Sequence, residues 1–452
     1  MLSRFVVKNF LSIYDKQEFS MYAGASTKYK KHISDIKNTK TLKYASLHGA
    51  NASGKSNLIE AIRFAKQAIL NGLETIECQE KYCKIKDIHK NEDSNFEFEL
   101  IINERVYSYG FILNLYNSEV VEEWLYELKS NSEDKMIFYR NNKKNIKDYN
   151  KKLFTSENKN KFQVWIEDSL NQKERLFLSE IYNKNNPSED LLIFKNIYTW
   201  FSEKLIIIYP DEHFHTAIFN IQKYSNLVCL LNKMDTGIKD IEYIEIEKGE
   251  LPIKLRNDTK LIELLKKILK KGKKNKQEKQ VLSNISYLYT IELDTDEELL
   301  FKKVVFKHSK DENATPLEFY EESDGTKRLI ELLQAINVCI SEGKTLLIDE
   351  IERSLHPKLI IKLIDYYLEN ISKPLSQLII TTHEDHLLNL KKIRRDSIWF
   401  VEKNYEGYSS IYSLDEYKVR NDLVLEKAYL EGRYGGVPII GKLNKIQLED
   451  CE

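Results

Sequence analysis

Short apolar runs alternate with longer amphipathic runs along this chain of 452 residues. The apolar runs are too short for helices and predict buried strands at residues 44–47, 204–209, 345–350 and 377–382. Apolar positions with helical spacing follow at residues 58–69, 329–340 and 358–370. Strands that alternate with helices are typical of a parallel sheet, so the pattern predicts an α/β fold.

A second pattern alternates apolar and polar residues one by one. Residues 96–102 and 105–113 alternate on either side of the short turn Asn103-Glu104, which predicts a β-hairpin. Residues 5–7, 120–128 and 136–139 have the same strand character, and residues 398–402 and 409–414 predict closing strands. We therefore expect an antiparallel subsheet beside the parallel one.

The order of these segments predicts that the chain consists of four parts. We expect an N-terminal lobe over residues 1–140 and helical insertions over residues 141–286, interrupted by the buried strand near 204–209. A C-terminal lobe over residues 287–414 and a tail over residues 415–452 complete the chain. The second insertion, roughly residues 216–286, has a helical pattern. The tail contains a glycine- and tyrosine-rich loop at 432–438, which we expect to dock a partner and to be dispensable for ligand binding.

Charge and cysteine content restrict the functional class. The 69 basic and 70 acidic residues nearly cancel, so contact with nucleic acid would require a local patch. One such patch is the lysine-rich stretch 260–279, but Gly272 interrupts it and no aromatic residue is interleaved, which favours a solvated surface. Five scattered cysteines favour free thiols. Because no signal-type or membrane-spanning segment is present, we expect a cytoplasmic protein.

The motif Gly49-Ala50-Asn51-Ala52-Ser53-Gly54-Lys55-Ser56 matches G-x-x-x-x-G-K-[ST] and lies between a predicted strand and a predicted helix. In such a phosphate-binding loop, glycines allow backbone N–H groups to surround a polyphosphate at a helix N-terminus. Lys55 is expected to reach the β- and γ-phosphates, and the Ser56 hydroxyl to bind Mg²⁺. The candidate nucleotide-binding residues here are Gly49, Asn51, Ser53, Gly54, Lys55, Ser56 and Asn57.

Two further predicted strands end in polar residues that suit phosphate chemistry. Asp349 and Glu350 end the 345–350 run, and adjacent strand residues point to opposite sides. We assign Asp349 to the metal and Glu350 to polarising the attacking water. His383 follows the 377–382 run and is expected to contact the γ-phosphate. The predicted catalytic residues are thus Glu350, His383 and Lys55.

Together with Ser323-x-Gly325, these residues resemble the Walker A, signature, Walker B and switch-histidine set of ABC-type ATPases. The long separation between Ser56 and Ser323 is more similar to structural-maintenance (SMC), RecF-like and OLD-type ATPases than to transporter subunits. The resemblance implies an α/β fold, a P-loop ABC-type ATPase head with an antiparallel β subsheet and an inserted helical subdomain. It implies ATP and Mg²⁺ as cofactors.

Within that branch the chain resembles the stand-alone ATPases of bacterial abortive-infection and anti-phage systems, the RloA/AbiL-like proteins. The resemblance is carried by Asn9-Phe10-x-Ser12, Tyr107-x-Tyr109-Gly110-Phe111, Glu123-Trp124-Leu125-Tyr126, Glu322–Thr326, Asp349–Pro357 and Tyr429–Gly435. It implies an ATPase that senses or regulates a separately encoded effector, a nuclease, in phage defence.

The same resemblance implies a head-to-head homodimer, in which Ser323 and Gly325 of one subunit close on the ATP held by Lys55 of the other. A helix N-terminus and a hydroxyl aimed at a γ-phosphate would make an anion site. Asp324 departs from the usual glycine of the signature, so its carboxylate must point away from phosphate or pair with Lys327 or Arg328. Assembly beyond the dimer and binding of nucleic acid stay open.

Two alternative functions follow from the same family branch. A self-contained OLD-like nuclease needs a metal-binding domain after the ATPase, and the 69 residues after His383 contain no D-x-D pair. Asp294-Thr295-Asp296 and His213-x-His215 are the other ligand-like groups, and an exposed loop explains the first more simply. A SMC- or RecF-like DNA-repair ATPase would be favoured by long heptads or a zinc hook, and the sequence has neither.

Overall fold

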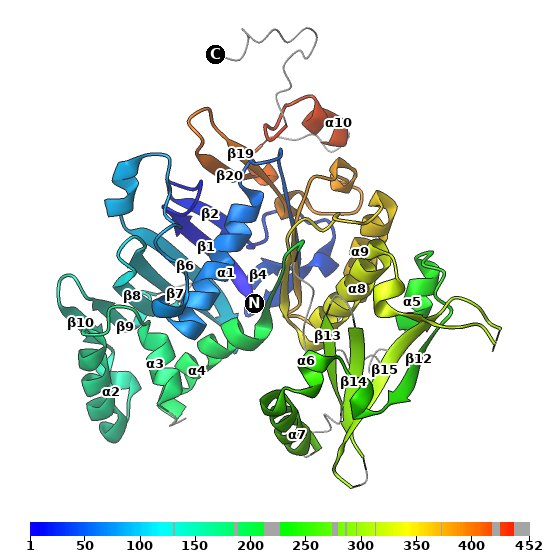
Figure 1. The fold of residues 1–452 in the computed structure, drawn as a ribbon. Coiled ribbons are helices and arrows are strands. Elements are labelled where there is room, and N and C mark those ends of the chain that lie inside the picture. Colours follow the sequence, from blue (N-terminus) through cyan, green and yellow to red (C-terminus); the bar gives the residue numbers. More distant parts are fainter. Residues whose placement is uncertain are drawn as a thin grey trace, which may run out of the picture. The chain divides into compact units, whose positions relative to one another are not determined.

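A computed structural model (Figure 1) describes residues 1–129, 132–184, 189–211, 227–273, 279–284, 287–294, 296–311, 313–371, 373–417 and 425–437. The chain divides into two compact units. The first contains Met1–Ile207, Leu347–Glu350 and Pro374–Glu452, and the second contains Ile208–Leu346 and Ile351–Lys373. Each unit is described separately below.

An antiparallel sheet of seven strands forms one part of the first unit. Its order is β10-β9-β8-β7-β6-β1-β2. The strands are β1 (Leu2–Lys8), β2 (Gln17–Ser20), β6 (Ser94–Ile102), β7 (Arg105–Asn114), β8 (Glu119–Leu128), β9 (Lys135–Asn141) and β10 (Ile146–Tyr149). The predicted hairpin is confirmed, since Ile102 pairs with Arg105 and both Asn103 and Glu104 have positive φ, as a two-residue type I′ turn requires.

A fully buried ion pair joins this sheet to the first helical insertion. The side chains of Glu123 on β8 and Arg140 on β9 are 0% exposed and 2.8 Å apart. Glu123 also accepts hydrogen bonds from the hydroxyl of Tyr109 and from the backbone N–H groups of Phe177 and Leu178. This carboxylate therefore holds the start of α3 (Phe177–Asn183) against the sheet, with every strong acceptor satisfied.

The first insertion is largely helical, although the strand β10 lies near its start. It contains α2 (Ser156–Ser169), α3, α4 (Leu192–Thr199) and a π-helical turn at Trp200–Lys204. Its core is an aromatic cluster in which Phe162 lies 5.3 Å from Phe177 and 5.6 Å from Phe194, measured between ring centroids. Burial of large aromatic rings stabilises such a small helical layer on the sheet.

The second sheet carries the phosphate-binding motif. Its order is β11-β17-β18-β5-β19-β20, where β5 pairs in parallel with β18 and β19. The strands are β5 (Tyr44–His48), β11 (Leu205–Ile208), β17 (Thr345–Ile348), β18 (Gln377–Thr382), β19 (Ile398–Lys403) and β20 (Ser409–Ser413). The helix α1 (Lys55–Asn71) follows β5 and packs on β1, and a small hairpin, β3 (Ile33–Ile36) and β4 (Thr39–Leu42), precedes β5.

The second unit mixes strands and helices, which differs from the helical pattern expected for residues 216–286. It contains a sheet in the order β12-β15-β14-β13, with β16 paired to β15. The strands are β12 (Asp240–Ile246), β13 (Lys279–Asn284), β14 (Tyr287–Leu293), β15 (Leu299–Lys307) and β16 (Leu317–Glu318). The helices are α5 (Leu227–Lys233), α6 (Ile253–Arg256), α7 (Thr259–Lys273), α8 (Asp324–Glu342) and α9 (Pro357–Asn370).

Most of the lysine-rich stretch 260–279 lies on α7, whose apolar face packs on this sheet through Leu265 and Leu269. Lys266 and Lys270 extend from that helix to Glu298 and Glu297, at 2.5 Å and 2.6 Å. The nearby D-x-D stretch is a hairpin turn, because Oδ1 of its first aspartate accepts backbone hydrogen bonds from the residues two and four positions later. These contacts agree with a solvated surface.

Among the residues that the structure describes, no helix combines the length and the apolar character needed to cross a membrane.

Candidate nucleotide-binding site

The phosphate-binding loop joins the end of β5 to the start of α1, as the motif predicts. Gly49 cannot carry a side chain, because a Cβ atom there would lie 2.3 Å from the carbonyl oxygen of Val401. Gly54 caps α1 with φ of 108°, and its Cβ would lie 2.3 Å from Oγ of Ser409. Both glycines are therefore required by close neighbours as well as by the curvature of the loop.

Lys55 brings two predicted parts of the site together. Its side chain is buried, and Nζ donates hydrogen bonds to the carbonyl oxygens of Gly49 at 2.8 Å and Ala50 at 3.1 Å. The same nitrogen lies 3.2 Å from Nε2 of His383, which follows β18 and is exposed. The ammonium group thus lies within the loop and beside the predicted switch histidine.

Two loop residues have donors that suit a polyphosphate. The Ser53 hydroxyl is buried and has no hydrogen-bond partner among the described residues. An unsatisfied buried donor is costly, and a phosphate oxygen would satisfy it. Asn51 lies at the exposed turn of the loop, where its side-chain amide is accessible to a ligand. The loop therefore fits a phosphorylated ligand.

Ser56 and Asp349 converge as predicted. Oγ of Ser56 donates to Oδ1 of Asp349 at 3.1 Å, and the carboxylate is only 2% exposed. Burial raises the pKa of Asp349 above its ordinary value, while hydrogen bonds from Thr381 and Ser56 act in the opposite direction. A hydroxyl and a carboxylate oxygen are ligands that Mg²⁺ prefers, so this pair fits the predicted metal.

Glu350 adopts a backbone conformation that the sequence did not predict. Strand β17 ends at Ile348, so Asp349 and Glu350 follow the strand instead of forming its end. Glu350 has a left-handed φ of 46°, so the two carboxylates lie on a bend and not on an alternating strand. Its backbone N–H donates to Oγ1 of Thr381 at 2.8 Å. A non-glycine residue in this region costs roughly 1–3 kcal/mol, and such residues cluster at active sites.

A series of hydrogen-bonded polar side chains connects the phosphate-binding loop to the neighbouring strand β20. Nδ2 of Asn57 donates to Oγ of Ser12 at 2.6 Å, and Oγ of Ser409 donates to the carbonyl oxygen of Ser53 at 2.6 Å. Ser12 and Ser409 are joined hydroxyl to hydroxyl at 2.6 Å. Since a hydroxyl has one proton, Ser12 must donate to Ser409. Asn57 and Ser12 belong to motifs that are visible in the sequence, whereas Ser409 belongs to none.

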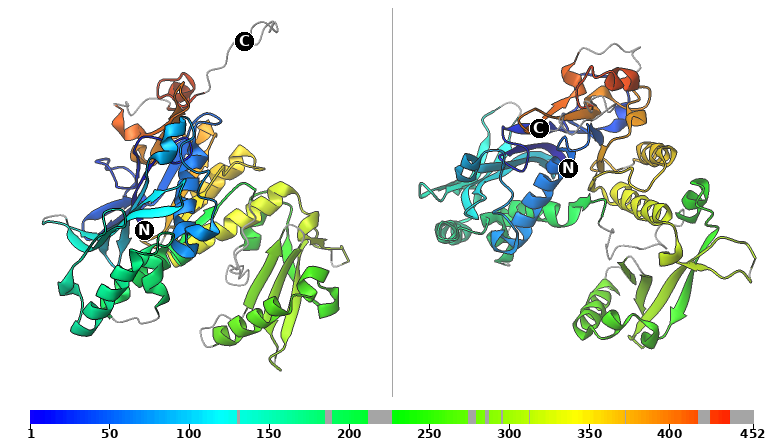
Figure 2. Two further views of the ribbon diagram at one scale, coloured as in Figure 1. Left: turned by 60° about the vertical axis from the view of Figure 1, so that its left-hand side comes forward. Right: turned by 45° about the horizontal axis from the view of Figure 1, so that its top comes forward.

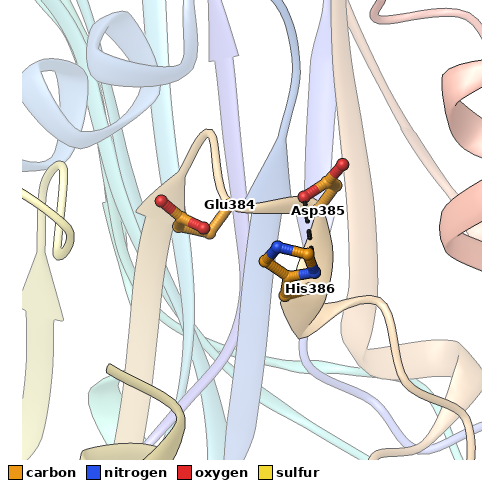
Figure 3. A group of neighbouring side chains, drawn as sticks. All are labelled: Glu384, Asp385 and His386. Atoms are coloured by element: carbon orange, nitrogen blue, oxygen red, sulfur yellow. Dashed lines mark ion pairs between the residues drawn. The ribbon is translucent and has the colours of Figure 1, made fainter. Parts of the chain in front are cut away.

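Three polar residues follow His383 directly. Glu384, Asp385 and His386 place one potential metal-binding atom each within 4.8 Å of the others (Figure 3). His386 is exposed, and its Nδ1 lies 3.0 Å from Oε1 of Glu426. Exposed groups of this kind are common without an ion, so we assign no metal to them. Of the three, His386 connects this loop to the C-terminal helix through its contact with Glu426.

The signature residues lie in the second unit, at the start of α8. Ser323 caps this helix, since its Oγ accepts a hydrogen bond from the backbone N–H of Thr326 at 3.1 Å. A Cβ at Gly325 would lie 2.8 Å from the carbonyl oxygen of Ser354, so glycine is required there. The Asp324 side chain is exposed and lies 3.7 Å from Nζ of Lys327. The roles of Ser323 and Gly325 toward nucleotide stay a prediction.

Comparison with known families agrees with this geometry. A protein-family model described as "AAA domain, putative AbiEii toxin, Type IV TA system" matches residues 45–389. The chain belongs to this family. The match covers well over half of the chain and includes the phosphate-binding loop, Asp349, Glu350 and His383. Membership supports a nucleotide-binding ATPase of the P-loop class, while a search of curated proteins finds no match.

Proposed function

We propose that the protein binds and hydrolyses ATP as an ABC-type ATPase. The observation that carries the proposal is the convergence of Lys55, Ser56 and Asp349, in which a buried ammonium, a hydroxyl and a carboxylate from two separate motifs meet at one loop. Lys55 would bind the β- and γ-phosphates, and Ser56 and Asp349 would hold Mg²⁺. When bound, Mg²⁺ neutralises charge on the phosphates and orients them.

The hydrolytic step is assigned to Glu350 and His383. Glu350 is partly exposed at the end of β17, where its carboxylate can accept a proton from water as the water oxygen attacks the γ-phosphorus. The bond from that phosphorus to the β,γ-bridging oxygen breaks, which releases ADP and phosphate. His383 lies beside Lys55 and would donate a hydrogen bond to the γ-phosphate.

We further propose that ATP joins two copies of the chain. Ser323 and Gly325 begin an α-helix, and a helix N-terminus favours an anion. In a head-to-head homodimer these residues of one copy would face the ATP held by the other. The exposed position of Asp324, turned toward Lys327, is compatible with a phosphate near the same helix end.

The biological role we propose is control of a separately encoded effector, a nuclease, in bacterial anti-phage defence. The family description names a toxin–antitoxin system, which favours an ATPase that works with a partner. An OLD-like nuclease within this chain is the second candidate, but its D-x-D stretch forms a hairpin turn, and His213 and His215 lie outside the described residues. Stimulation by DNA ends would instead favour a DNA-repair ATPase.

The test compares purified wild type, Glu350→Gln and Lys55→Ala, each with ATP and Mg²⁺. Wild type should hydrolyse ATP, and Glu350→Gln should bind ATP but hydrolyse it about 10²–10⁴-fold more slowly. Lys55→Ala should lose binding. The same samples are incubated with DNA and RNA, and none should cleave them. If the wild-type protein does not bind ATP, the ATPase proposal is wrong. If the wild-type protein cleaves DNA or RNA and the variants do not, the nuclease activity belongs to this chain.

A further inference from the structure

The C-terminal segment, defined as residues 425–437, is packed into the first unit. It contains α10 (Leu425–Leu430) and the glycine-rich loop that follows. Tyr429 and Tyr434 are each only 7% exposed. The two views in Figure 2 show the segment, in red, beside the orange β19 and β20. It lies outside the region matched by the family model.

The glycine-rich loop of this segment touches the phosphate-binding loop. A Cβ atom at Gly436 would lie 3.4 Å from Cα of Gly49 and 3.6 Å from the carbonyl oxygen of Val401. Gly49 is itself so close to Val401 that it tolerates no side chain. The first glycine of the phosphate-binding loop therefore packs tightly on β19 and has the C-terminal segment close beside it.

Tyr429 fixes the position of Gly436. Its hydroxyl donates to the carbonyl oxygen of Gly436 at 2.9 Å, and its ring meets the ring of His48 edge-on, with centroids 6.4 Å apart. His48 is the residue directly before Gly49. Burial raises the pKa of Tyr429 to about 12, so its hydroxyl remains a donor at neutral pH.

Aromatic stacking anchors the segment to the sheet. Phe400 on β19 stacks with Tyr429 at 5.3 Å and with Tyr434 at 5.9 Å between ring centroids. The hydroxyl of Tyr412 on β20 donates to the carbonyl oxygen of Tyr434 at 2.7 Å. Stacked aromatic pairs add about 0.5–1.5 kcal/mol each beyond their burial, so the segment is held firmly.

A second anchor lies on the other side of α10. Oε1 of Glu426 on α10 lies 3.0 Å from Nδ1 of His386, three residues after His383. The segment thus contacts the chain just after β18 as well as the loop after β5. These are the two strand ends that carry the switch histidine and the phosphate-binding loop.

We propose that residues 425–437 are a positioning element of the nucleotide site, with Gly436 and Tyr429 holding Gly49 in the conformation that receives phosphate. The inference rests on the proposed ATPase function. Backbone N–H groups bind a polyphosphate well only when the loop is already in place, because ordering it during binding costs free energy. This assignment replaces our expectation that the tail would be dispensable for ligand binding.

The test uses two asparagine variants made in the Glu350→Gln background, so that ATP is not consumed. Gly436 and Gly432 both have left-handed φ, at 68° and 76°, and asparagine tolerates that region. A Cβ at Gly432 meets nothing within 4 Å, whereas one at Gly436 faces Gly49. Titration with Mg-ATP should show Gly436→Asn weakened about ten- to hundredfold, as expected for a misplaced binding group. Gly432→Asn should bind like its parent.

Tyr429→Phe is the second variant and is made in the otherwise wild-type chain. It keeps the ring stack and removes only the hydrogen bond to Gly436, so the KM for ATP should rise about twofold to tenfold with kcat unchanged. Its melting temperature without ligand should fall only slightly, because a single hydrogen bond is lost and the ring packing is kept. Normal KM in Tyr429→Phe, or equal affinity in the two asparagine variants, overturns the inference. A parent that binds no Mg-ATP overturns the proposed function as well.

Discussion

Oγ1 of Thr381 lies 2.5 Å from Oδ1 of Asp349, to which it donates a hydrogen bond. The same oxygen accepts the backbone N–H of Glu350 at 2.8 Å. One hydroxyl on β18 therefore sets the positions of the residue assigned to Mg²⁺ and the residue assigned to water. Because Thr381 sits two residues before His383, a single strand end organises three parts of the site.

Replacing this hydroxyl should change the pH dependence of hydrolysis. In Thr381→Val, Asp349 loses a hydrogen bond that lowers its pKa, so the pKa should rise further. Since Asp349 must be ionised to hold Mg²⁺, the acid limb of the kcat/KM profile should move to higher pH. Thr382→Val is the control, because the Thr382 hydroxyl accepts a hydrogen bond from the backbone N–H of Glu384 and not from a residue of the metal site. Coincident profiles for Thr381→Val and wild type would show that Thr381 does not tune Asp349.

The serine behind the loop should matter for ATP affinity. Ser409→Ala removes hydrogen bonds to Ser53 and Ser12, and the KM for ATP should rise roughly three- to tenfold, since each bond contributes about 0.5–1.5 kcal/mol. Ser410→Ala changes the exposed neighbour on β20 and should leave KM unchanged. Steady-state kinetics compare the two, and identical KM values would assign Ser409 no part in holding the loop.

The proposed dimer can be tested without disturbing α8. Ser323→Asp keeps an oxygen acceptor at the helix cap, so the monomer should stay folded. In the dimer its carboxylate would face the γ-phosphate of the other copy. We therefore expect Glu350→Gln to double in mass on addition of Mg-ATP, measured by light scattering, and Glu350→Gln/Ser323→Asp to stay monomeric. Dimers in both, or in neither, would argue against the ATP-joined arrangement.

The buried pair in the antiparallel sheet should govern stability. Glu123→Gln leaves the fully buried Arg140 without its charge partner, which should cost about 3–5 kcal/mol in urea denaturation. Glu119→Gln breaks the exposed ion pair with Lys173 and should cost less than about 1 kcal/mol. If both variants lose a similar free energy of unfolding, the buried pair contributes no more to stability than the exposed pair does. Glu123 is one of the residues that carry the resemblance to defence ATPases, and in the structure it forms the buried pair with Arg140.

The sequence identified the parts of the site whose signal is local. The phosphate-binding loop has a fixed spacing, and Asp349 and His383 follow apolar runs that are visible without any tertiary information. Thr381, Ser409 and Gly436 gave no such signal. Their importance depends on the strand order β17-β18-β5-β19-β20, which pairs segments more than 300 residues apart in sequence.

The second insertion shows where the pattern was ambiguous. Strand β12 reads Asp-Ile-Glu-Tyr-Ile-Glu-Ile and alternates, but it lies at the edge of its sheet and only its last residue is buried. An exposed edge strand carries little hydrophobic signal, so the charged residues around it favoured a helical interpretation. Pairing with β15 decides the conformation, and α6, α7, β13 and β14 separate the two paired strands in the sequence.

The order in which the site is built has a consequence for synthesis. A nascent chain that has left the ribosome as far as His383 already contains Lys55, Ser56 and Asp349. It lacks Ser409, which holds Ser53, and Gly436, which lies close beside Gly49. With the positioning roles proposed above, such a chain should bind ATP more weakly than the protein that includes Ser409 and Gly436.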